Sequence, residues 1–337
     1  MIRDIPDKEK ILFEKPDDQG LFGATFFAFN TVIRLRAFFS LEHNKDAEDA
    51  AAQNLVQTLV SLCRRYEWLL SRTLDKSDIF RLNNAQGFAV KIDRDTWEAL
   101  DQGLRYSSQS KGHFDITMGS VTHLWDFAGQ RIPENAEIEQ ALTHVDWQKV
   151  KLSRKEQDEE GYFARLLDSS AMIDLGGTAK GFIADKMCKL MQEQGVNGAF
   201  VNLGGNVAVF GAKPDGSSWR IGIQSPFDPD KIRGAISLFT GSVVTSGLYE
   251  RCFTHNGKLY HHILDVKTGF PVCSDIAGVS VVAASSADAD GYSTTLFALG
   301  TKKAIEFVEE LDDIEVIIID KSGEIITSSG LLNFIPL

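Results

Sequence analysis

Residues 198–211, G-A-F-V-N-L-G-G-N-V-A-V-F-G, contain two short apolar runs on either side of Gly204-Gly205. A β-hairpin explains this stretch well, because glycine readily adopts the backbone angles of a tight turn. A ligand-binding role for the glycine turn is the less favoured alternative. The hairpin is followed by a series of expected short strands, and this series indicates the fold class.

The expected elements are short strands mixed with a few long helices. Strands are expected at residues 24–39, 173–175, 199–203, 206–211, 219–224, 233–239, 258–265, 276–284, 314–320 and 323–328. Helices are expected at 46–70, from Asp93 onward, from the Gly176-Gly177 turn to about Gln194, within 287–300 and after Thr301. The charged residues 154–160 are expected to form an exposed turn. This mixture predicts an α+β fold with a largely antiparallel sheet core and packed helices.

The composition is typical of a globular protein with an acidic surface. The chain has 337 residues, of which 43% are hydrophobic and 24% charged, and its formal net charge is −12. Because it contains neither a repeat nor a low-complexity linker, we expect an N-terminal tail at 1–20 and a single domain at 21–337. An acidic surface without a basic block repels nucleic acid and anionic membranes, so no nucleic-acid partner is expected.

Cysteine usage and the N-terminal sequence predict a cytoplasmic protein. The four cysteines are scattered without a C-x-x-C pair, which indicates reduced thiols and neither a disulfide framework nor a zinc site. They are Cys63, Cys188, Cys252 and Cys273. The first residues lack an apolar signal region, and no apolar run is long enough to form a membrane segment.

Residues 287–300, A-D-A-D-G-Y-S-T-T-L-F-A-L-G, contain a candidate metal site. Asp290 and Thr294 are four residues apart, so a helix places both side chains on one face. A carboxylate and a hydroxyl are hard oxygen ligands, which suit Mg²⁺ better than zinc. The alternative is an ordinary helix start, with Asp288 or Asp290 as the N-cap and Thr294 packed inside.

Residues 174–181, D-L-G-G-T-A-K-G, join an expected strand to an expected helix through paired glycines. Such a turn brings the backbone close to a ligand and directs amide groups at it, and Lys180 adds a positive charge. The stretch matches neither a Walker A loop nor a G-x-G-x-x-G fingerprint. A plain strand-to-helix turn with a solvated Lys180 is the alternative.

Two adjacent histidines lie in an expected strand. Because neighbouring strand residues point to opposite faces, His261 and His262 should have different environments. One of them could act as a base, since the ordinary pKa of histidine is close to neutrality. A packed core histidine is the alternative interpretation. The loop Gly112–Thr117 carries no clear signal of its own.

Four motifs, taken together and in this order, resemble those of the ApbE family, the FAD:protein FMN transferases. They are D-L-G-G-T-A-K-G at 174–181, S-G-L-Y-E-R at 246–251, H-H-I-L-D-V-K-T-G-F-P at 261–271 and A-D-G-Y-S-T-T-L-F-A-L-G at 289–300. The resemblance covers roughly residues 24–330. It implies an ApbE-like, T-fold-like architecture. It also implies a Mg²⁺-dependent enzyme that moves FMN from FAD onto a threonine or serine of a target flavoprotein and releases AMP.

The resemblance also implies roles for individual residues. His262 matches the general base, and the metal ligands would be the side chains of Asp290 and Thr294 with the carbonyl of Gly177. Positions expected to contact FAD are Phe29, His113, Phe114, Asp115, Asp174, Lys180 and the backbone near Leu264. A Mg²⁺-dependent FAD pyrophosphatase stays open as an alternative, as does a non-catalytic flavin-binding protein.

The chain departs from the family pattern at several positions. Relatives usually carry M-G-T where Phe29-Asn30-Thr31 stands, and an aromatic residue that would stack on the flavin where Thr73 stands. Leu248 replaces a common acidic residue, and Val266 replaces a common proline. We therefore expect the FAD pocket of this protein to differ from that of its relatives.

Overall fold

The computed structural model describes residues 10–39, 45–248 and 251–337. Within this part of the chain the largest sheet has nine strands, and every neighbouring pair is antiparallel. From one edge to the other they are β1 (Leu12–Glu14), β2 (Leu21–Ala28), β3 (Thr31–Phe38), β7 (Gly198–Leu203), β8 (Asn206–Phe210), β11 (Gly241–Gly247), β14 (Ile276–Ala283), β15 (Ile314–Asp320) and β16 (Ile325–Thr327). The predicted α+β fold with a largely antiparallel sheet core is therefore confirmed.

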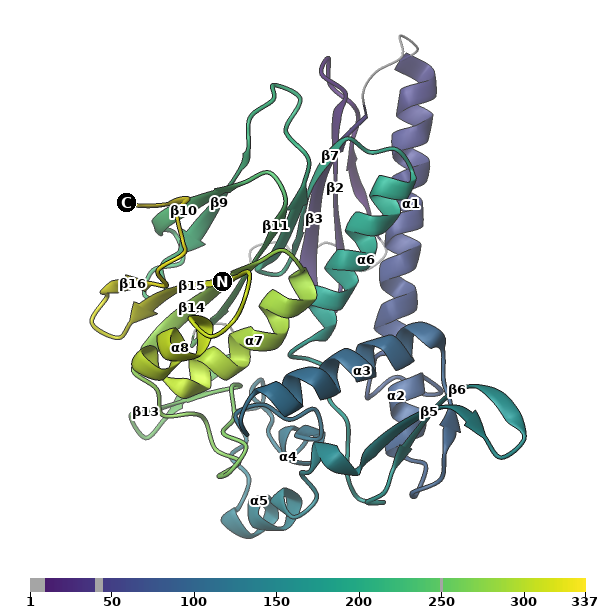
Figure 1. Cartoon of the computed structure of the whole chain (residues 1–337), viewed down its shortest axis with the longest axis vertical. Helices are drawn as coiled ribbons and strands as arrows, with labels where there is room; N and C mark the ends of the chain where they lie inside the picture. Colours follow the sequence, from purple (N-terminus) through teal and green to yellow (C-terminus); the bar gives the residue numbers. More distant parts are fainter. Residues whose placement is uncertain (1–9, 40–44, 249–250) are drawn as a thin grey trace.

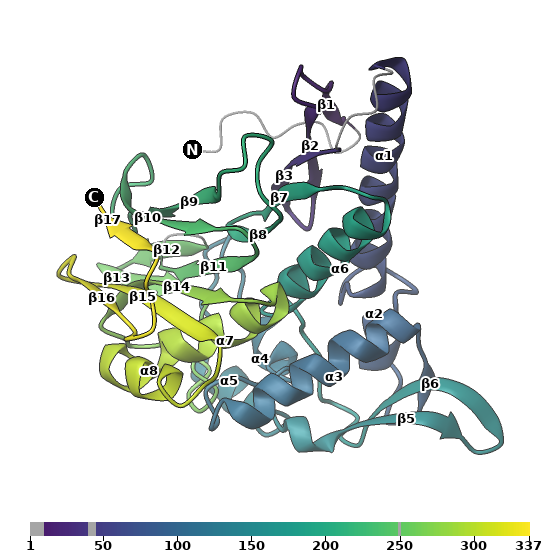
Figure 2. The same cartoon turned by 45° about the horizontal axis from the view of Figure 1, so that its top comes forward.

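Helices cover one face of this sheet (Figures 1 and 2). They are α1 (Lys45–Leu69), α6 (Ala179–Glu193), α7 (Ser286–Leu299) and α8 (Thr301–Val308). Helix α6 packs on β7 and β8, whereas α7 packs on β11 and β14 and also lies against α6. The two helices that carry the predicted site residues are therefore direct neighbours over the middle of the sheet.

A small sheet covers part of the other face. It consists of β9 (Trp219–Gln224), β10 (Ile232–Leu238) and β17 (Phe334–Pro336). Strand β8 shows how both faces are buried: Val207 and Val209 pack against this small sheet, whereas Ala208 and Phe210 face the helices. Burial on both faces explains the continuous apolar runs of the central strands.

A second group of elements lies below the helix layer in Figure 1. It contains the helices α2 (Asp78–Asn83), α3 (Arg94–Gln109), α4 (Gly119–Thr122) and α5 (Asn135–Leu142), a 3₁₀ turn at Trp147–Lys149, and a sheet of β4 (Val90–Lys91), β6 (Glu159–Leu166) and β5 (Val150–Glu156). The two-stranded sheet of β12 (Cys252–His255) and β13 (Lys258–His261) completes the fold. Helix α3 packs against α7, so this group helps to hold the helix with the candidate metal ligands.

Several expected element boundaries are wrong. The strand expected at 24–39 is a hairpin of β2 and β3, because Phe29 and Asn30 both adopt left-handed backbone angles, with φ of 54° and 56°. The turn expected at 154–160 is mostly strand, since β5 and β6 flank a turn after residue 156. Residues 173–175 form no strand, and Met172 makes only an isolated bridge with Met118.

The first strand of the structure lies within the expected N-terminal tail. Within residues 1–20, the expected tail, β1 pairs with β2, and residues 1–9 lie outside the described residues. Tyr249 and Glu250 of the S-G-L-Y-E-R motif also lie outside them. No helix in the described ranges has the length and apolar content needed to cross a membrane.

Candidate active site

Helix α7 presents the two candidate metal ligands at the face that meets α6. Its N-cap is Ser285, whose hydroxyl accepts from the amide of Asp288 at 3.3 Å, so neither Asp288 nor Asp290 caps the helix. Asp290 is buried, and its Oδ2 accepts a hydrogen bond from the amide of Gly181 at 2.8 Å. The carboxylate therefore lies directly beside the first turn of α6.

The glycine turn before α6 lies against α7. A Cβ atom added to Gly177 would come within 3.6 Å of Thr294 Oγ1 and within 3.1 Å of the Phe114 ring. The structure thus brings together residues from three distant segments of the chain. The close approach also explains why a residue without a side chain is suitable at position 177.

Lys180 acts electrostatically on two other candidate residues. Burial raises the pKa of Asp290, whereas the charge of Lys180 and the amide of Gly181 oppose this shift. Burial also lowers the pKa of the His262 imidazole to about 4, with Arg251 and then Lys180 adding to the effect. A single lysine is therefore close enough to influence both the candidate metal ligand and the candidate base.

The two histidines differ in their environments, although only His261 lies in the observed strand. His261 ends β13 and is buried, with Nε2 at 3.2 Å from the carbonyl of Val272 and its ring edge-on to Phe297. His262 follows the strand, which ends four residues earlier than expected, and its amide donates to the carbonyl of Arg251. Among the described residues, neither buried Nδ1 atom has a hydrogen-bond partner.

Asp174 is held by its neighbours before the glycine turn. Its Oδ1 accepts from the amide of Gly176 at 2.8 Å, and its Oδ2 accepts from Thr122 Oγ1 at 2.8 Å. Arg72 Nε lies 3.4 Å from the same Oδ2. Arg72 precedes Thr73, the position of the missing aromatic residue, so the chain places a cation on this side of the site.

One residue of the His113–Asp115 loop lies against the glycine turn, and the other two lie in its surroundings. Phe114 is buried against Gly177, whereas the Asp115 carboxylate accepts from the amides of Thr117 and Trp147 and from the Thr117 hydroxyl. Burial lowers the pKa of His113, and the charge of Lys267 adds to this effect. The loop therefore lies near the turn after the histidine strand.

Leu264 and Phe29 have different surroundings. Leu264 is buried in an apolar cluster with Met118 and Trp125, and its backbone forms a bridge with Pro271. Phe29 lies in the turn between β2 and β3, where its amide donates to Glu67 of α1 at 2.8 Å. The FAD contacts expected of both residues stay predictions.

The donor set at α7 and the glycine turn fits Mg²⁺. The described residues contain no group of three or more His, Cys, Asp or Glu side chains that could hold a metal. Mg²⁺ does not need such a cage, because it is commonly bound by one or two carboxylates together with substrate phosphates. One buried carboxylate, one hydroxyl and nearby backbone carbonyls are hard oxygen donors of the appropriate kind.

Sequence reasoning missed Arg72, Asp185 and Asn206. Asp185 accepts three hydrogen bonds from the start of α7, and Asn206 Oδ1 accepts from the hydroxyl of Ser286 in its first turn. A signal was present for Asp185, since it follows Gly181 by four residues and so lies on the same face of α6. Asn206 directly follows the Gly204-Gly205 turn, for which a plain hairpin was the favoured interpretation and a ligand-binding role the alternative.

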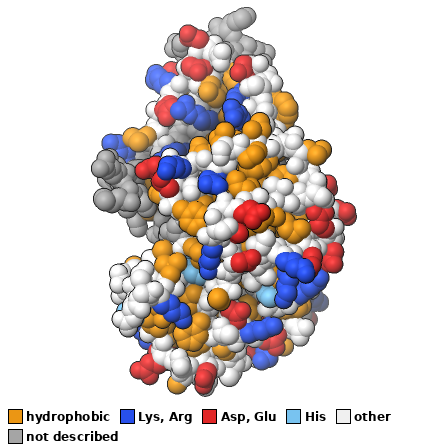
Figure 3. Space-filling model, turned by 90° about the vertical axis from the view of Figure 1, so that its left-hand side faces the viewer, with side chains coloured by type: hydrophobic (Ala, Val, Ile, Leu, Met, Phe, Trp, Pro, Cys, Tyr) orange, Lys and Arg blue, Asp and Glu red, His pale blue; other side chains and the backbone are white. Residues whose placement is uncertain are grey.

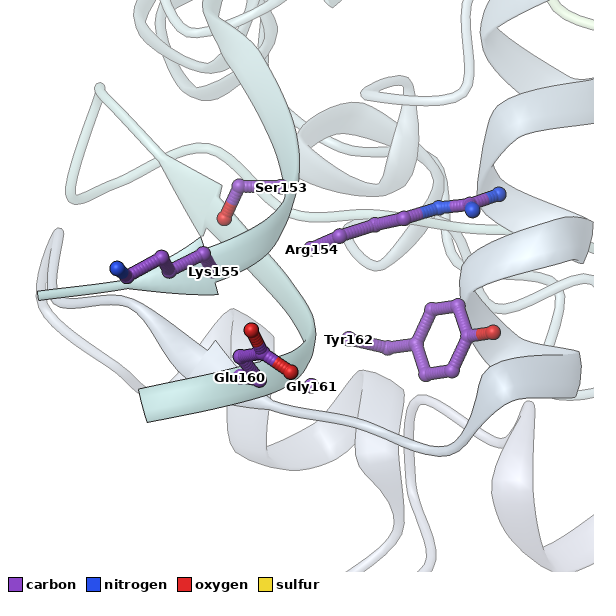
Figure 4. A pocket seen from close by; sticks show the side chains of 6 residues that line it. All are labelled: Ser153, Arg154, Lys155, Glu160, Gly161 and Tyr162. Atoms are coloured by element: carbon purple, nitrogen blue, oxygen red, sulfur yellow. The ribbon is translucent and has the colours of Figure 1, made fainter. Parts of the chain in front are cut away.

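A surface hollow of about 620 Å³ lies elsewhere, at the β5–β6 hairpin (Figure 4). It is lined by Ser153, Arg154, Lys155, Glu160, Gly161 and Tyr162. None of the predicted site residues lines it, and Arg154 lies over the rings of Trp97 and Tyr162. On the face shown in Figure 3, acidic and basic side chains are interspersed between apolar ones.

Comparison with known proteins identifies the family. The ApbE family model matches residues 29–318. A FAD:protein FMN transferase of Klebsiella pneumoniae (strain 342) is 34% identical over 288 residues, which is 84% of this chain and 88% of that protein. The FAD:protein FMN transferase of Treponema pallidum (strain Nichols) is 32% identical over 315 residues, covering 90% of this chain and 85% of that protein.

Solved structures agree with these sequence relationships. The crystal structure of the ApbE protein from Thermotoga maritima superposes with a TM-score of 0.80 at 27% identity, over 92% of this chain and 97% of that one. The family expected from the four motifs is therefore confirmed at the level of sequence and of fold. With the match extending over most of its length, this chain belongs to the ApbE family.

Proposed function

We propose that this protein is a Mg²⁺-dependent flavin transferase that moves FMN from FAD onto a threonine or serine hydroxyl of a target flavoprotein and releases AMP. The observation that carries the proposal is its 34% identity, over 84% of its length, to a protein named FAD:protein FMN transferase. The cluster of Asp290, Thr294 and Gly177 beside Lys180 supports it from the structure.

Asp290 and Thr294, with the carbonyl of Gly177, are the residues that would hold Mg²⁺. When bound, the ion neutralises negative charge on the diphosphate of FAD. The buried position of Asp290 supports this role, because a buried carboxylate is costly unless a cation or hydrogen bonds compensate for it. Lys180 adds a second positive charge in a protein of net charge −12.

His262 is the proposed general base. The acceptor hydroxyl attacks the phosphorus on the FMN side of the diphosphate, and His262 takes its proton on a ring nitrogen. The new P–O bond forms as the bond to the bridging oxygen breaks, so that AMP leaves with that oxygen. A pKa of about 4 keeps His262 neutral and able to accept a proton near neutrality. The diphosphate of FAD would offset the charge of Lys180 and make the imidazole more basic.

The remaining predicted contacts belong to the binding of FAD. We propose that Phe114, Asp174 and the backbone near Leu264 line the substrate site, with His113, Asp115 and Phe29 contributing from its surroundings. Phe114 has the best structural support, because its ring lies against Gly177. The cytoplasmic location stays a prediction.

The test is an incubation of the protein with FAD, Mg²⁺ and a candidate acceptor, followed by mass measurement of the acceptor and of the small-molecule products. A mass gain of one FMN group on the acceptor, with release of AMP, supports the transferase. An acceptor in which the target threonine is replaced by valine is the matched control. Free FMN and AMP with an unmodified acceptor would assign the protein as a FAD pyrophosphatase, and intact FAD would assign it as non-catalytic.

A further inference from the structure

Helix α7 begins against a carboxylate that belongs to helix α6. Asp185 accepts from the Ser285 hydroxyl at 2.8 Å, from the amide of Ser286 at 2.8 Å and from the amide of Ala287 at 3.0 Å. The first amides of a helix have no partner within the helix, so such contacts stabilise its start. The local N-cap, Ser285, accepts only from the amide of Asp288. The beginning of α7 is therefore held mainly from outside.

A second contact lies one turn earlier on α6. The amide of Gly181 donates to Asp290 Oδ2 at 2.8 Å. A Cβ atom on Gly181 would come within 2.3 Å of the carbonyl oxygen of Ser286 and within 2.7 Å of Asp290 Cβ. The contacts are four residues apart on both helices, at 181 and 185 on α6 and at 286 and 290 on α7. This spacing fixes the position of α7 along α6 as well as its rotation.

The charge of Asp185 has a consequence for the neighbouring site. Asp185 is half-buried and makes no ion pair with another of the described residues, and its charge adds to burial in raising the pKa of Asp290. A buried carboxylate with a second carboxylate nearby is unfavourable unless a cation compensates for the charge. Asp185 therefore both positions the helix and adds negative potential where a divalent cation would bind.

We propose that Asp185 is a positioning residue that holds α7 so that Asp290 and Thr294 face the Gly177 turn in a geometry suitable for Mg²⁺. The inference rests on the proposed function of Asp290 and Thr294 as metal ligands. Asp185 itself does not contact the reacting atoms in this proposal. Loss of the Asp185 side chain should shift α7 and so weaken metal binding. The loss of metal affinity should be larger than the loss of folding stability alone would cause.

The experiment measures metal binding without turnover. Mn²⁺, which also prefers oxygen ligands, is titrated into the protein without FAD and followed by electron paramagnetic resonance. We expect Asp185→Ala to weaken Mn²⁺ binding by about tenfold or more, the usual effect of losing a group that orients a metal ligand. In the transfer assay, the half-saturating Mg²⁺ concentration should rise similarly, whereas the rate at saturating Mg²⁺ should change much less.

Asp185→Asn is the conservative variant. Its amide oxygen can still accept from the Ser286 amide, but its NH₂ group cannot accept from Ala287 or Ser285. We expect a smaller loss of Mn²⁺ binding than in Asp185→Ala. This variant keeps the proposal testable if the alanine variant does not fold.

Asp78→Asn is the matched control. Asp78 is buried and accepts from the amide of Asp93 and from Thr96 Oγ1, both at 2.7 Å, where α3 begins. It therefore also supports a helix start from a neighbouring helix, but it lies outside the cluster of Gly177, Asp290 and Thr294. We expect Asp78→Asn to lower the melting temperature and to leave Mn²⁺ binding and the Mg²⁺ dependence unchanged.

The outcomes distinguish the positioning role of Asp185 from the metal-ligand role of Asp290 and Thr294, on which it rests. If both Asp185 variants lower the melting temperature but bind Mn²⁺ as the wild type does, Asp185 is only structural and the inference is overturned. If Asp290→Ala also binds Mn²⁺ normally, the metal site itself is wrongly assigned. Loss of binding in Asp290→Ala with graded losses in the two Asp185 variants supports both.

Discussion

His262 shows how far a residue's chemistry depends on its surroundings. Burial and the charges of Arg251 and Lys180 lower its pKa from 6.5 to about 4. A base must be unprotonated in order to act. The imidazole can therefore accept a proton above this pKa, whereas below it the imidazole is already protonated and inactive as a base. We expect the transfer rate to fall on acidification only as pH approaches 4, or somewhat higher once FAD is bound. A pH–rate profile at saturating FAD and Mg²⁺ measures this.

Substitution of the two histidines tests the assignment. His262→Asn should lower the rate by about two to four decades, the usual contribution of a positioned base, with FAD affinity retained. His261→Asn should affect the rate much less but should lower the melting temperature, because His261 is buried against Val272 and Phe297. Single-turnover rates and thermal melts measure both effects. Equal rate losses in the two variants would contradict the assignment.

The lowered pKa of His262 also predicts a pH dependence of stability. Between about 4 and 6.5 the unfolded chain binds a proton on this histidine that the folded chain does not. The contribution of neutral His262 to the free energy of unfolding is therefore fully present above pH 6.5. It is lost as the pH falls from 6.5 towards about 4. Urea unfolding at pH 7 and pH 5 should show a smaller acid-induced loss in His262→Asn than in the wild type.

Asp290 is the residue on which the metal proposal depends most. Asp290→Ala should abolish the Mg²⁺-dependent rate because it removes the one carboxylate of the proposed donor set. The fold should be largely retained, since the variant leaves the Gly181 amide without a partner, at a cost of about 1–3 kcal/mol, but also removes a buried charge. Activity against Mg²⁺ concentration and a thermal melt measure the two effects. Near-normal turnover at low Mg²⁺ would contradict the assignment.

At the scale of elements, the contact between α6 and α7 is the most sensitive feature of the site. Gly181→Ala places a methyl group where the Ser286 carbonyl and Asp290 now lie, so the two helices must move apart. We expect a loss of stability of about 1–3 kcal/mol, typical of overpacking, together with weaker Mg²⁺ dependence. Gly278→Ala on β14 is the control, since its nearest neighbour would be 3.5 Å away in Pro226. If both variants lose stability and Mg²⁺ dependence to the same extent, the contact between α6 and α7 is not the cause of these losses.

Most long elements could be predicted from the sequence, and their errors have local causes. The N-cap at Asp93 and the end of α6 before Gly195 are as expected, because both depend on local backbone chemistry. The hairpin of β2 and β3 was missed because Phe29-Asn30 contains no glycine and the apolar alternation continues across it. Strands β5 and β6 were missed because their exposed, charged residues resemble a loop.

At the scale of the whole molecule, the proposed substrate preference can be tested by binding. NAD shares the AMP half and the diphosphate with FAD, so discrimination between them depends on contacts with the flavin half. We expect tighter binding of FAD than of NAD in calorimetric titrations with Mg²⁺ present, and the chain carries no G-x-G-x-x-G fingerprint for NAD. Equal or tighter binding of NAD would contradict this expectation.

The fold class, the family and the candidate pair Asp290 and Thr294 could all be predicted from the amino-acid sequence. These follow from local properties: strand and helix periodicity, glycine turns and a four-residue spacing that one helix converts into a shared face. The four motifs were also sufficient to indicate the family, because their order along the chain is itself information.

Which of these segments lie in contact depends on the tertiary structure. Gly177, Phe114 and Thr294 come from separate parts of the chain, and their contact depends on how α6 and α7 pack over the sheet. The lowered pKa of His262 and the hydrogen bonds from Asp185 to α7 depend on the same packing. Burial and through-space charge are properties of neighbours in three dimensions, so the linear spacing of residues does not contain them.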